Sequence, residues 1–125
     1  MWRLMFIGFL IAHGLVHLAM WVFVPRPAPG KEAPFDASYS WVLGSQKALA
    51  AAVAAATATI LILAGIGLWA HADWWRAGAV IGLTASFGLM VVYFTPWFIF
   101  IEAVNAALIA SIVWLSWPSE AMVGA

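Results

Sequence analysis

Residues Gln46–Ala70 read QKALAAAVAAATATILILAGIGLWA, and no charged residue follows Lys47 in this run. A helix needs about 20 consecutive apolar residues to cross the hydrocarbon core of a bilayer, and this run is long enough. Its alanine-rich first half offers the small side chains through which helices approach one another closely in lipid. The run therefore predicts a transmembrane helix that packs against a neighbouring helix.

Three further apolar runs of similar length flank this one, over Trp2–Val24, Trp74–Phe94 and Pro96–Trp117. The first has a basic residue, Arg3, near its start, as a secretory signal would, but it exceeds the roughly 7–15 apolar residues of such a signal and lacks a small-residue cleavage site. We therefore interpret it as a span. The sequence predicts an all-α fold, a four-helix transmembrane bundle formed by a single integral membrane domain over residues 1–125, with a proline-rich loop between helices 1 and 2.

The overall composition agrees with a membrane protein. Hydrophobic residues make up 66% of the chain, five basic residues balance five acidic ones, and the mean hydropathy is +1.04. No basic cluster is present, which argues against nucleic acid as a partner, and the absence of cysteine excludes thiol chemistry. The expected partners are membrane lipids and other membrane protein chains. The basic residues divide too evenly between the two faces to predict an orientation.

The segment between the first two spans, residues 25–45, is the polar exception. Its extended first half is predicted by four prolines, Pro25, Pro27, Pro29 and Pro34. Asp36 is placed to cap a short interfacial helix over Ala37–Leu43, which Gly44 would end and Trp41 would anchor among the lipid headgroups. We interpret the segment as a lid over one end of the bundle.

The junctions between the later spans carry helix-start signals and aromatic residues. Asp73 is a candidate N-cap for the third span, and Thr95 with Pro96 forms a typical start for the fourth. We expect the tryptophans near the second junction to lie at headgroup level and the aromatic residues near the third to face lipid. These two groups are Trp69, Trp74 and Trp75, and Phe94, Trp97, Phe98 and Phe100.

Small residues also form stripes on two of the predicted helices. Gly78, Gly82 and Ser86 recur at every fourth position, and Gly65 and Gly67 follow the alanine-rich run. Stripes of this kind let backbones approach closely. We predict that they pack helices within the chain rather than form a dimer contact.

Five polar side chains from three of the predicted helices fall at one depth. His13 and His17 lie four residues apart on one helix face, and Glu102 and Asn105 lie three apart on another. At about 1.5 Å per residue, they and Ser86 lie roughly 9–16 Å below the helix ends on the loop side. A buried carboxylate needs a partner, and a histidine is the obvious one. The sequence predicts a cluster inside the bundle.

Three interpretations of this cluster remain open. In the first, it is a hydrogen-bonded network that fixes which helices meet. In the second, it ligates a cofactor, either a divalent metal through His13, His17 and Glu102 or a tetrapyrrole through one imidazole. In the third, His17 and Glu102 form a catalytic acid–base pair. Gly14 would let a backbone or a flat ligand approach. His71 lies at the opposite membrane face, where we interpret it as a capping or interfacial residue.

The run from Arg3 to Leu18, RLMFIGFLIAHGLVHL, resembles the first helix of small four-span bacterial membrane proteins of the DoxX-like kind. The resemblance covers one helix together with the chain length and the number of spans. It implies a four-helix bundle in the bacterial cytoplasmic membrane and a loose link to membrane redox or quinone-associated proteins. It assigns no catalytic residue.

These observations favour an accessory or ligand-binding subunit of a larger membrane assembly, in which the chain forms an oligomer with other chains. The alternative is a small membrane enzyme that acts on an apolar, quinone- or isoprenoid-like substrate through His17 and Glu102.

Overall fold

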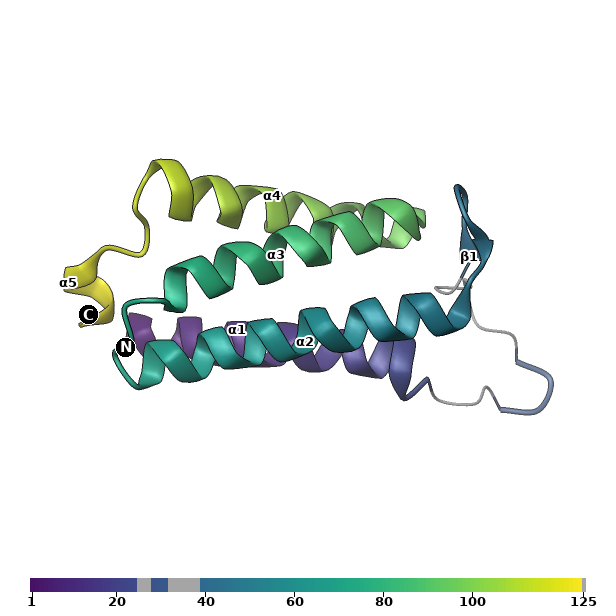
Figure 1. The fold of residues 1–125 in the computed structure, drawn as a ribbon, viewed down its shortest axis with the longest axis horizontal. Coiled ribbons are helices and arrows are strands. Elements are labelled where there is room, and N and C mark those ends of the chain that lie inside the picture. Colours follow the sequence, from purple (N-terminus) through teal and green to yellow (C-terminus); the bar gives the residue numbers. More distant parts are fainter. Residues whose placement is uncertain (25–27, 32–38, 125) are drawn as a thin grey trace.

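The computed structural model describes residues 1–24, 28–31 and 39–124, and its described elements are mainly helices (Figure 1). In chain order the elements are α1 (Trp2–His17), the π-helical turn η1 (Leu18–Val22), β1 (Tyr39–Ser40), β2 (Gly44–Ser45), α2 (Lys47–Trp69), α3 (Trp75–Val92), the 3-10 turn η2 (Pro96–Phe98), α4 (Ile99–Trp114) and α5 (Glu120–Val123). Four helical stretches are long and apolar enough to cross a membrane: Trp2–Val22, Lys47–Trp69, Trp75–Val92 and Pro96–Trp114. The predicted four spans are confirmed, with each end shortened by a few residues at most.

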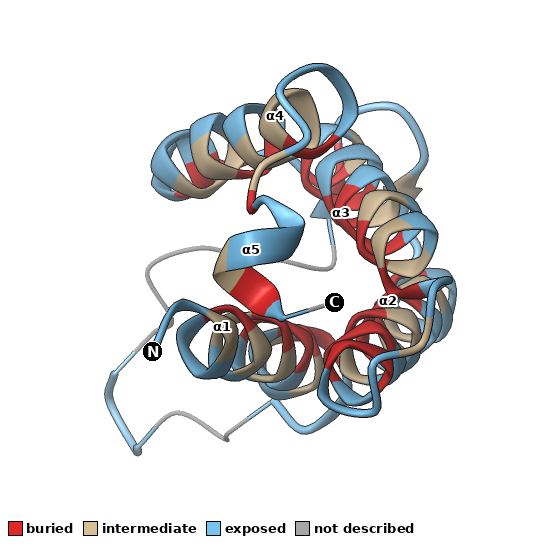
Figure 2. Cartoon of the chain, turned by 90° about the vertical axis from the view of Figure 1, so that its left-hand side faces the viewer, coloured by how far each residue is buried: buried red, intermediate tan, exposed pale blue. Residues whose placement is uncertain are grey.

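The four long helices are arranged in chain order around an arc (Figure 2). Helix α1 packs against α2, α2 against α3, and α3 against α4. Among the described residues, α1 and α4 do not pack against each other as neighbouring helices. The pairing of Glu102 with a histidine, predicted from the sequence, requires these two helices to lie side by side, and that expectation was wrong. At the end of the bundle that carries the termini, the short helix α5 lies between them and contacts α1.

Glycines set the close contacts between the first three helices. A Cβ at Gly14 on α1 would lie 2.9 Å from the backbone oxygen of Ala58 on α2, and one at Gly82 on α3 would lie 2.7 Å from Leu61 Cδ2. A Cβ at Gly78 would lie 3.3 Å from the Cβ of Ala64. The glycine stripe on α3 therefore packs against α2 within the chain, as predicted, and Gly14 admits a neighbouring backbone rather than a ligand.

Gly14→Ala is expected to lower the free energy of unfolding by about 1.5 kcal/mol, because the new methyl group meets a backbone carbonyl that cannot rotate away. Gly8→Ala on the same helix is the matched control, since a Cβ there meets nothing within 4 Å. The measurement is denaturant unfolding in lipid nanodiscs. Equal stability of the two variants would contradict the assigned α1–α2 contact.

The turn between α2 and α3 is closed by backbone hydrogen bonds. The N–H of Ala72 donates to the carbonyl of Gly67 (2.9 Å) and that of His71 to Leu68 (3.3 Å), while His71 adopts a left-handed conformation with φ 56°. This is the Schellman pattern that ends many helices. His71 therefore occupies a capping position, as expected. The predicted Asp73 cap was wrong, because Trp74 is the N-cap residue of α3 and no side chain caps the start of that helix.

The end of the loop before α2 forms a hairpin, so the helix predicted over Ala37–Leu43 was wrong for residues 39–43. Strands β1 and β2 pair antiparallel, with Tyr39 opposite Ser45 and Ser40 opposite Gly44. The hydroxyl of Ser40 accepts hydrogen bonds from the backbone N–H groups of residues 42 and 43, and Gly44 has φ 71°, both of which favour a turn. The predicted cap, Asp36, lies outside the described residues.

Two side chains attach this hairpin to the end of α3. Ser40 Oγ donates to the carbonyl of Val92 (2.7 Å), and Trp41 Nε1 donates to the carbonyl of Val91 (2.7 Å). These carbonyls belong to the last turn of a helix, which lacks intrahelical donors. Trp41 is otherwise exposed. The hairpin therefore binds one end of the bundle through side-chain caps.

The hydrophobic core consists of two clusters, one in each half of the bundle. The cluster nearer the termini includes Phe6, Leu61 and Trp75, and the cluster nearer the loop includes Trp21 and Phe98. Trp75 and Phe98 are 2% and 1% exposed, so the expectation of a lipid-facing position for Phe98 was wrong. Both side chains contact aromatic rings on the first span, Trp75 edge-on against Phe6 and Phe98 at a tilt against Trp21.

Candidate functional site

A row of aromatic and imidazole rings follows the inner face of the first span. Phe9, His13, His17 and Trp21 recur at every fourth position, and successive ring centroids lie 5.3, 5.1 and 5.5 Å apart. Side chains four residues apart lie on one helix face, which explains the row. The π-helical turn η1 begins directly after His17. Such turns occur frequently at functional sites. The two histidines therefore lie between aromatic neighbours, in the layer between the two core clusters.

Ser86 on α3 joins α1 to α4, although those two helices are not packed together. Its Oγ lies 3.1 Å from His13 Nε2 and accepts a hydrogen bond from Asn105 Nδ2 at 2.8 Å. Ser86 and Asn105 are fully buried and His13 is 9% exposed. We call these three residues the serine bridge. It confirms the expected inward-facing polar layer for the residues that form it.

The hydrogen bonds fix the positions of the protons in the cluster. His17 Nδ1 lies 3.2 Å from the carbonyl oxygen of His13, which can only accept, so Nδ1 donates. A neutral imidazole carries one N–H, and Nε2 of His17 is therefore an acceptor. Because the Ser86 hydroxyl accepts from Asn105, its own proton is available to donate to His13 Nε2. Nε2 of His13 therefore has a hydrogen-bond partner, whereas Nε2 of His17 has none among the described residues.

Several buried polar atoms in this region have no hydrogen-bond partner in the described part of the chain. They are His17 Nε2, Asn105 Oδ1, both carboxyl oxygens of Glu102 and Thr57 Oγ1. The predicted pairing of Glu102 with a histidine was therefore wrong. The two groups come from helices that are held apart by the intervening α3, whereas the sequence analysis assumed direct contact between the helices. Buried polar groups are normally paired, so unpaired ones mark a candidate binding site.

The predicted metal set does not assemble. Within residues 1–24, 28–31 and 39–124, no group of three or more His, Asp and Glu side chains could hold a metal ion, and the set includes His13, whose Nε2 already bonds to Ser86. A tetrapyrrole would bind through a free imidazole nitrogen such as Nε2 of His17. That ring is fully buried between His13 and Trp21. A macrocycle has no space beside it without separation of the helices.

An apolar pocket lies between α1 and the C-terminal part of the chain, in the half of the bundle nearer the termini. Its volume is about 180 Å³, and it is open on one side. Its walls are Trp2, Met5, Phe6, Phe9, Leu108, Trp117 and Pro118. The pocket is smaller than the roughly 300–1,000 Å³ of sites for drug-sized ligands, and it has the size of a single ring or a short hydrocarbon segment.

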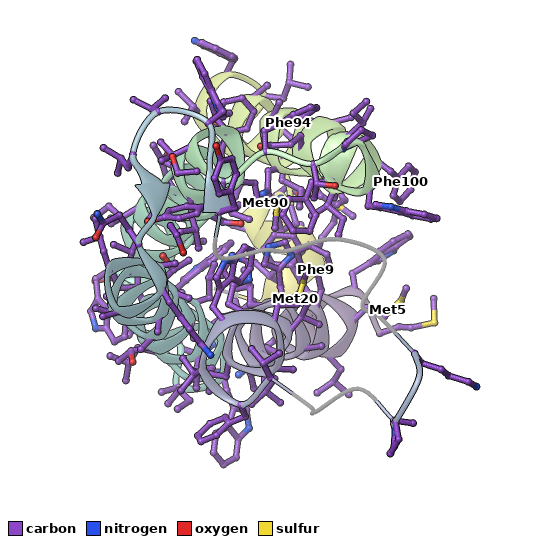
Figure 3. All side chains as sticks on the ribbon, turned by 90° about the vertical axis from the view of Figure 1, so that its right-hand side faces the viewer. Met5, Phe9, Met20, Met90, Phe94 and Phe100 are labelled. Carbon is purple, nitrogen blue, oxygen red and sulfur yellow. The ribbon has the colours of Figure 1, made fainter. Side chains whose placement is uncertain are left out.

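The pocket lies between α1 and the C-terminal part of the chain, and His17 on α1 and Glu102 and Asn105 on α4 lie nearer the loop; we call this boundary between α1 and α4 the seam. Viewed from the loop end, Phe9 and Met90 lie towards the middle of the bundle, whereas Met5 on α1 and Phe100 on α4 lie at its outer edge on one side (Figure 3). Phe9 both lines the pocket and stacks against His13. The seam thus runs from apolar side chains near the termini to polar ones near the loop.

Sequence reasoning missed the aromatic members of this site. Phe9 and Trp21 stand four residues before His13 and four after His17, so a search for ring side chains at helical spacing would have found them. The contact of Trp21 with Phe98, at 5.6 Å between ring centroids, had no signal in the sequence. Trp117 lies beyond the end of α4, in the segment that returns towards α1, and its place in the pocket depends on the path of that segment.

No protein family, curated protein or solved structure matches this chain. The fold and the site define it as a four-span membrane protein with a buried His–Ser–Asn hydrogen-bond cluster. The resemblance of its first helix to DoxX-like proteins stays a prediction.

Proposed function

We propose that this protein is a small ligand-binding subunit of a larger assembly in the bacterial cytoplasmic membrane, and that it takes up an apolar molecule from the bilayer through the seam. The observation that carries this proposal is the open-sided pocket of about 180 Å³. Ligand sites in helical bundles lie between helices and are lined mainly by hydrophobic and aromatic side chains. The walls of this pocket have that composition.

The packing of α4 supports a role in an assembly. Among the long helices, α4 packs against α3. In an 18-residue stretch of the fourth span, 17% of the residues are buried, compared with 33–39% in the other three spans. Aromatic side chains such as Phe100 and Trp114 are each 77% exposed on it. Another membrane chain would pack against this surface through van der Waals contacts, which drive helix association in lipid.

The proposal predicts that toluene stabilises the protein and that a filled pocket abolishes the effect. Leu108→Trp is expected to occupy the pocket, whereas Val113→Trp adds the same side chain at an exposed position on the same helix. At a free concentration of about 100 times its Kd, a ligand adds about 2.7 kcal/mol to the free energy of unfolding. Thermal unfolding in nanodiscs is the measurement. Toluene should raise the Tm of the wild type and of Val113→Trp and leave that of Leu108→Trp unchanged; equal shifts in all three would contradict the proposal.

The alternative function is a membrane enzyme that acts on a quinone- or isoprenoid-like substrate with His17 and Glu102 as an acid–base pair. Such a pair exchanges a proton at hydrogen-bond distance, directly or through one water. Within the described part of the chain, both carboxyl oxygens of Glu102 and Nε2 of His17 lack a hydrogen-bond partner, so the pair has no direct contact. Binding needs no such contact, which is why we place binding first.

A further inference from the structure

The part of the seam nearer the loop is bounded by one contact at each end. The serine bridge closes it on the side of the termini, and the contact between the Trp21 and Phe98 rings closes it on the side of the loop. His17 lies one turn above the bridge on α1, because it follows His13 by four residues. Glu102 lies one turn above the bridge on the antiparallel α4, because it precedes Asn105 by three. His17 and Glu102 therefore occupy the same layer, between the serine bridge and the Trp21–Phe98 contact.

The orientation of the His17 ring directs its free atom into this layer. His13 and Trp21 stack on either side of the ring along the helix, and Nδ1 is bound to the carbonyl of the same helix. Nε2 is the ring nitrogen remote from the backbone, so it points away from α1 towards the interior. It is fully buried and has no partner among the residues that the structure describes.

Two of the unsatisfied atoms here are hydrogen-bond acceptors. His17 Nε2 is an acceptor because Nδ1 carries the proton, and Asn105 Oδ1 is an acceptor because the amide nitrogen donates to Ser86. An acceptor without a donor costs about 1–3 kcal/mol when it is buried. A hydroxyl group on a bound molecule would supply the donor that His17 Nε2 lacks.

We propose that the seam binds an apolar molecule with a hydroxyl group, and that this hydroxyl donates its hydrogen bond to Nε2 of His17. The apolar body of the molecule extends between α1 and α4 towards the lipid. This inference rests on the proposed uptake through the seam and adds the chemistry of the ligand's polar end.

The test uses cresol, which is toluene with one added hydroxyl, and methylanisole, in which a methyl group blocks that hydroxyl. One hydrogen bond to a buried acceptor is worth about a tenfold change in affinity. Wild-type protein in nanodiscs should bind cresol about tenfold more tightly than methylanisole. His17→Phe keeps a ring in the stack and removes the acceptor, so the preference should disappear. His71→Phe, the same replacement at the other end of the bundle, should retain it.

A measurement on the wild type makes the test independent of whether the variants fold. The chain has three histidines, so ¹⁵N-histidine labelling resolves each ring nitrogen. Cresol should shift the Nε2 resonance of His17, and methylanisole should not. Equal shifts with both probes, or an Nε2 that is already hydrogen-bonded to buried water and does not respond to cresol, overturn the inference. If toluene stabilises the protein but cresol shows no preference, this inference fails and the proposed function stands; if toluene has no effect, the proposed function itself fails.

Discussion

Ser86→Ala is expected to lower the free energy of unfolding by about 2.5 kcal/mol. The substitution removes the hydroxyl to which His13 Nε2 and Asn105 Nδ2 are bound, and the described residues offer neither atom another partner. A buried polar group that loses its partner costs about 1–3 kcal/mol, and hydrogen bonds in membrane proteins lie at the low end of that range. Two hydrogen bonds are lost here, so the two costs add. Denaturant unfolding in nanodiscs measures the loss.

Ser111→Ala provides the matched control for this experiment. The hydroxyl of Ser111 donates to the carbonyl of Ala107 in its own helix, so its removal breaks no contact between helices. A change within about 0.5 kcal/mol is expected for an exposed position of this kind. If both serine variants lose the same stability, Ser86 does not join α1 to α4.

Glu102→Leu is expected to raise the free energy of unfolding by about 2 kcal/mol. Both carboxyl oxygens are buried without a hydrogen-bond partner, and an apolar side chain of similar size removes that penalty. The sign of the effect is decisive, because a carboxylate paired with histidine, as the sequence predicted, would make the same substitution destabilising. The measurement is again unfolding in nanodiscs.

Glu102→Gln is the control that separates polarity from shape. It keeps the length of the side chain and leaves a polar group in the same place, so we expect a change of no more than about 0.5 kcal/mol relative to the wild type. A stabilised leucine variant beside an unchanged glutamine variant would support a polar group retained for binding rather than for folding, since functional sites commonly cost stability. Destabilisation of both variants would contradict the unpaired state of Glu102.

The spans and their approximate ends could be predicted because each depends on a run of neighbouring residues. The apolar length needed to cross a bilayer is a local property, and so is the four-residue spacing that puts His13 and His17 on one face. The glycine stripe on α3 predicted a contact within the chain, and Gly82 forms one with Leu61. The depth of the polar layer followed from counting residues along antiparallel helices.

The choice of neighbours among the helices was decided only by the tertiary structure. Lipid is as apolar as the helix surfaces, so hydrophobicity does not determine which helix packs against which. That choice depends on the fit of small residues such as Gly14 against Ala58, and it placed α1 beside α2 and away from α4. Ser86, between the two, became the common partner of His13 and Asn105, and Glu102 was left without one. The sequence by itself determined the four spans and the level of the polar groups, whereas the three-dimensional fit of the helices decided which of those groups form hydrogen bonds and which remain free to bind a ligand.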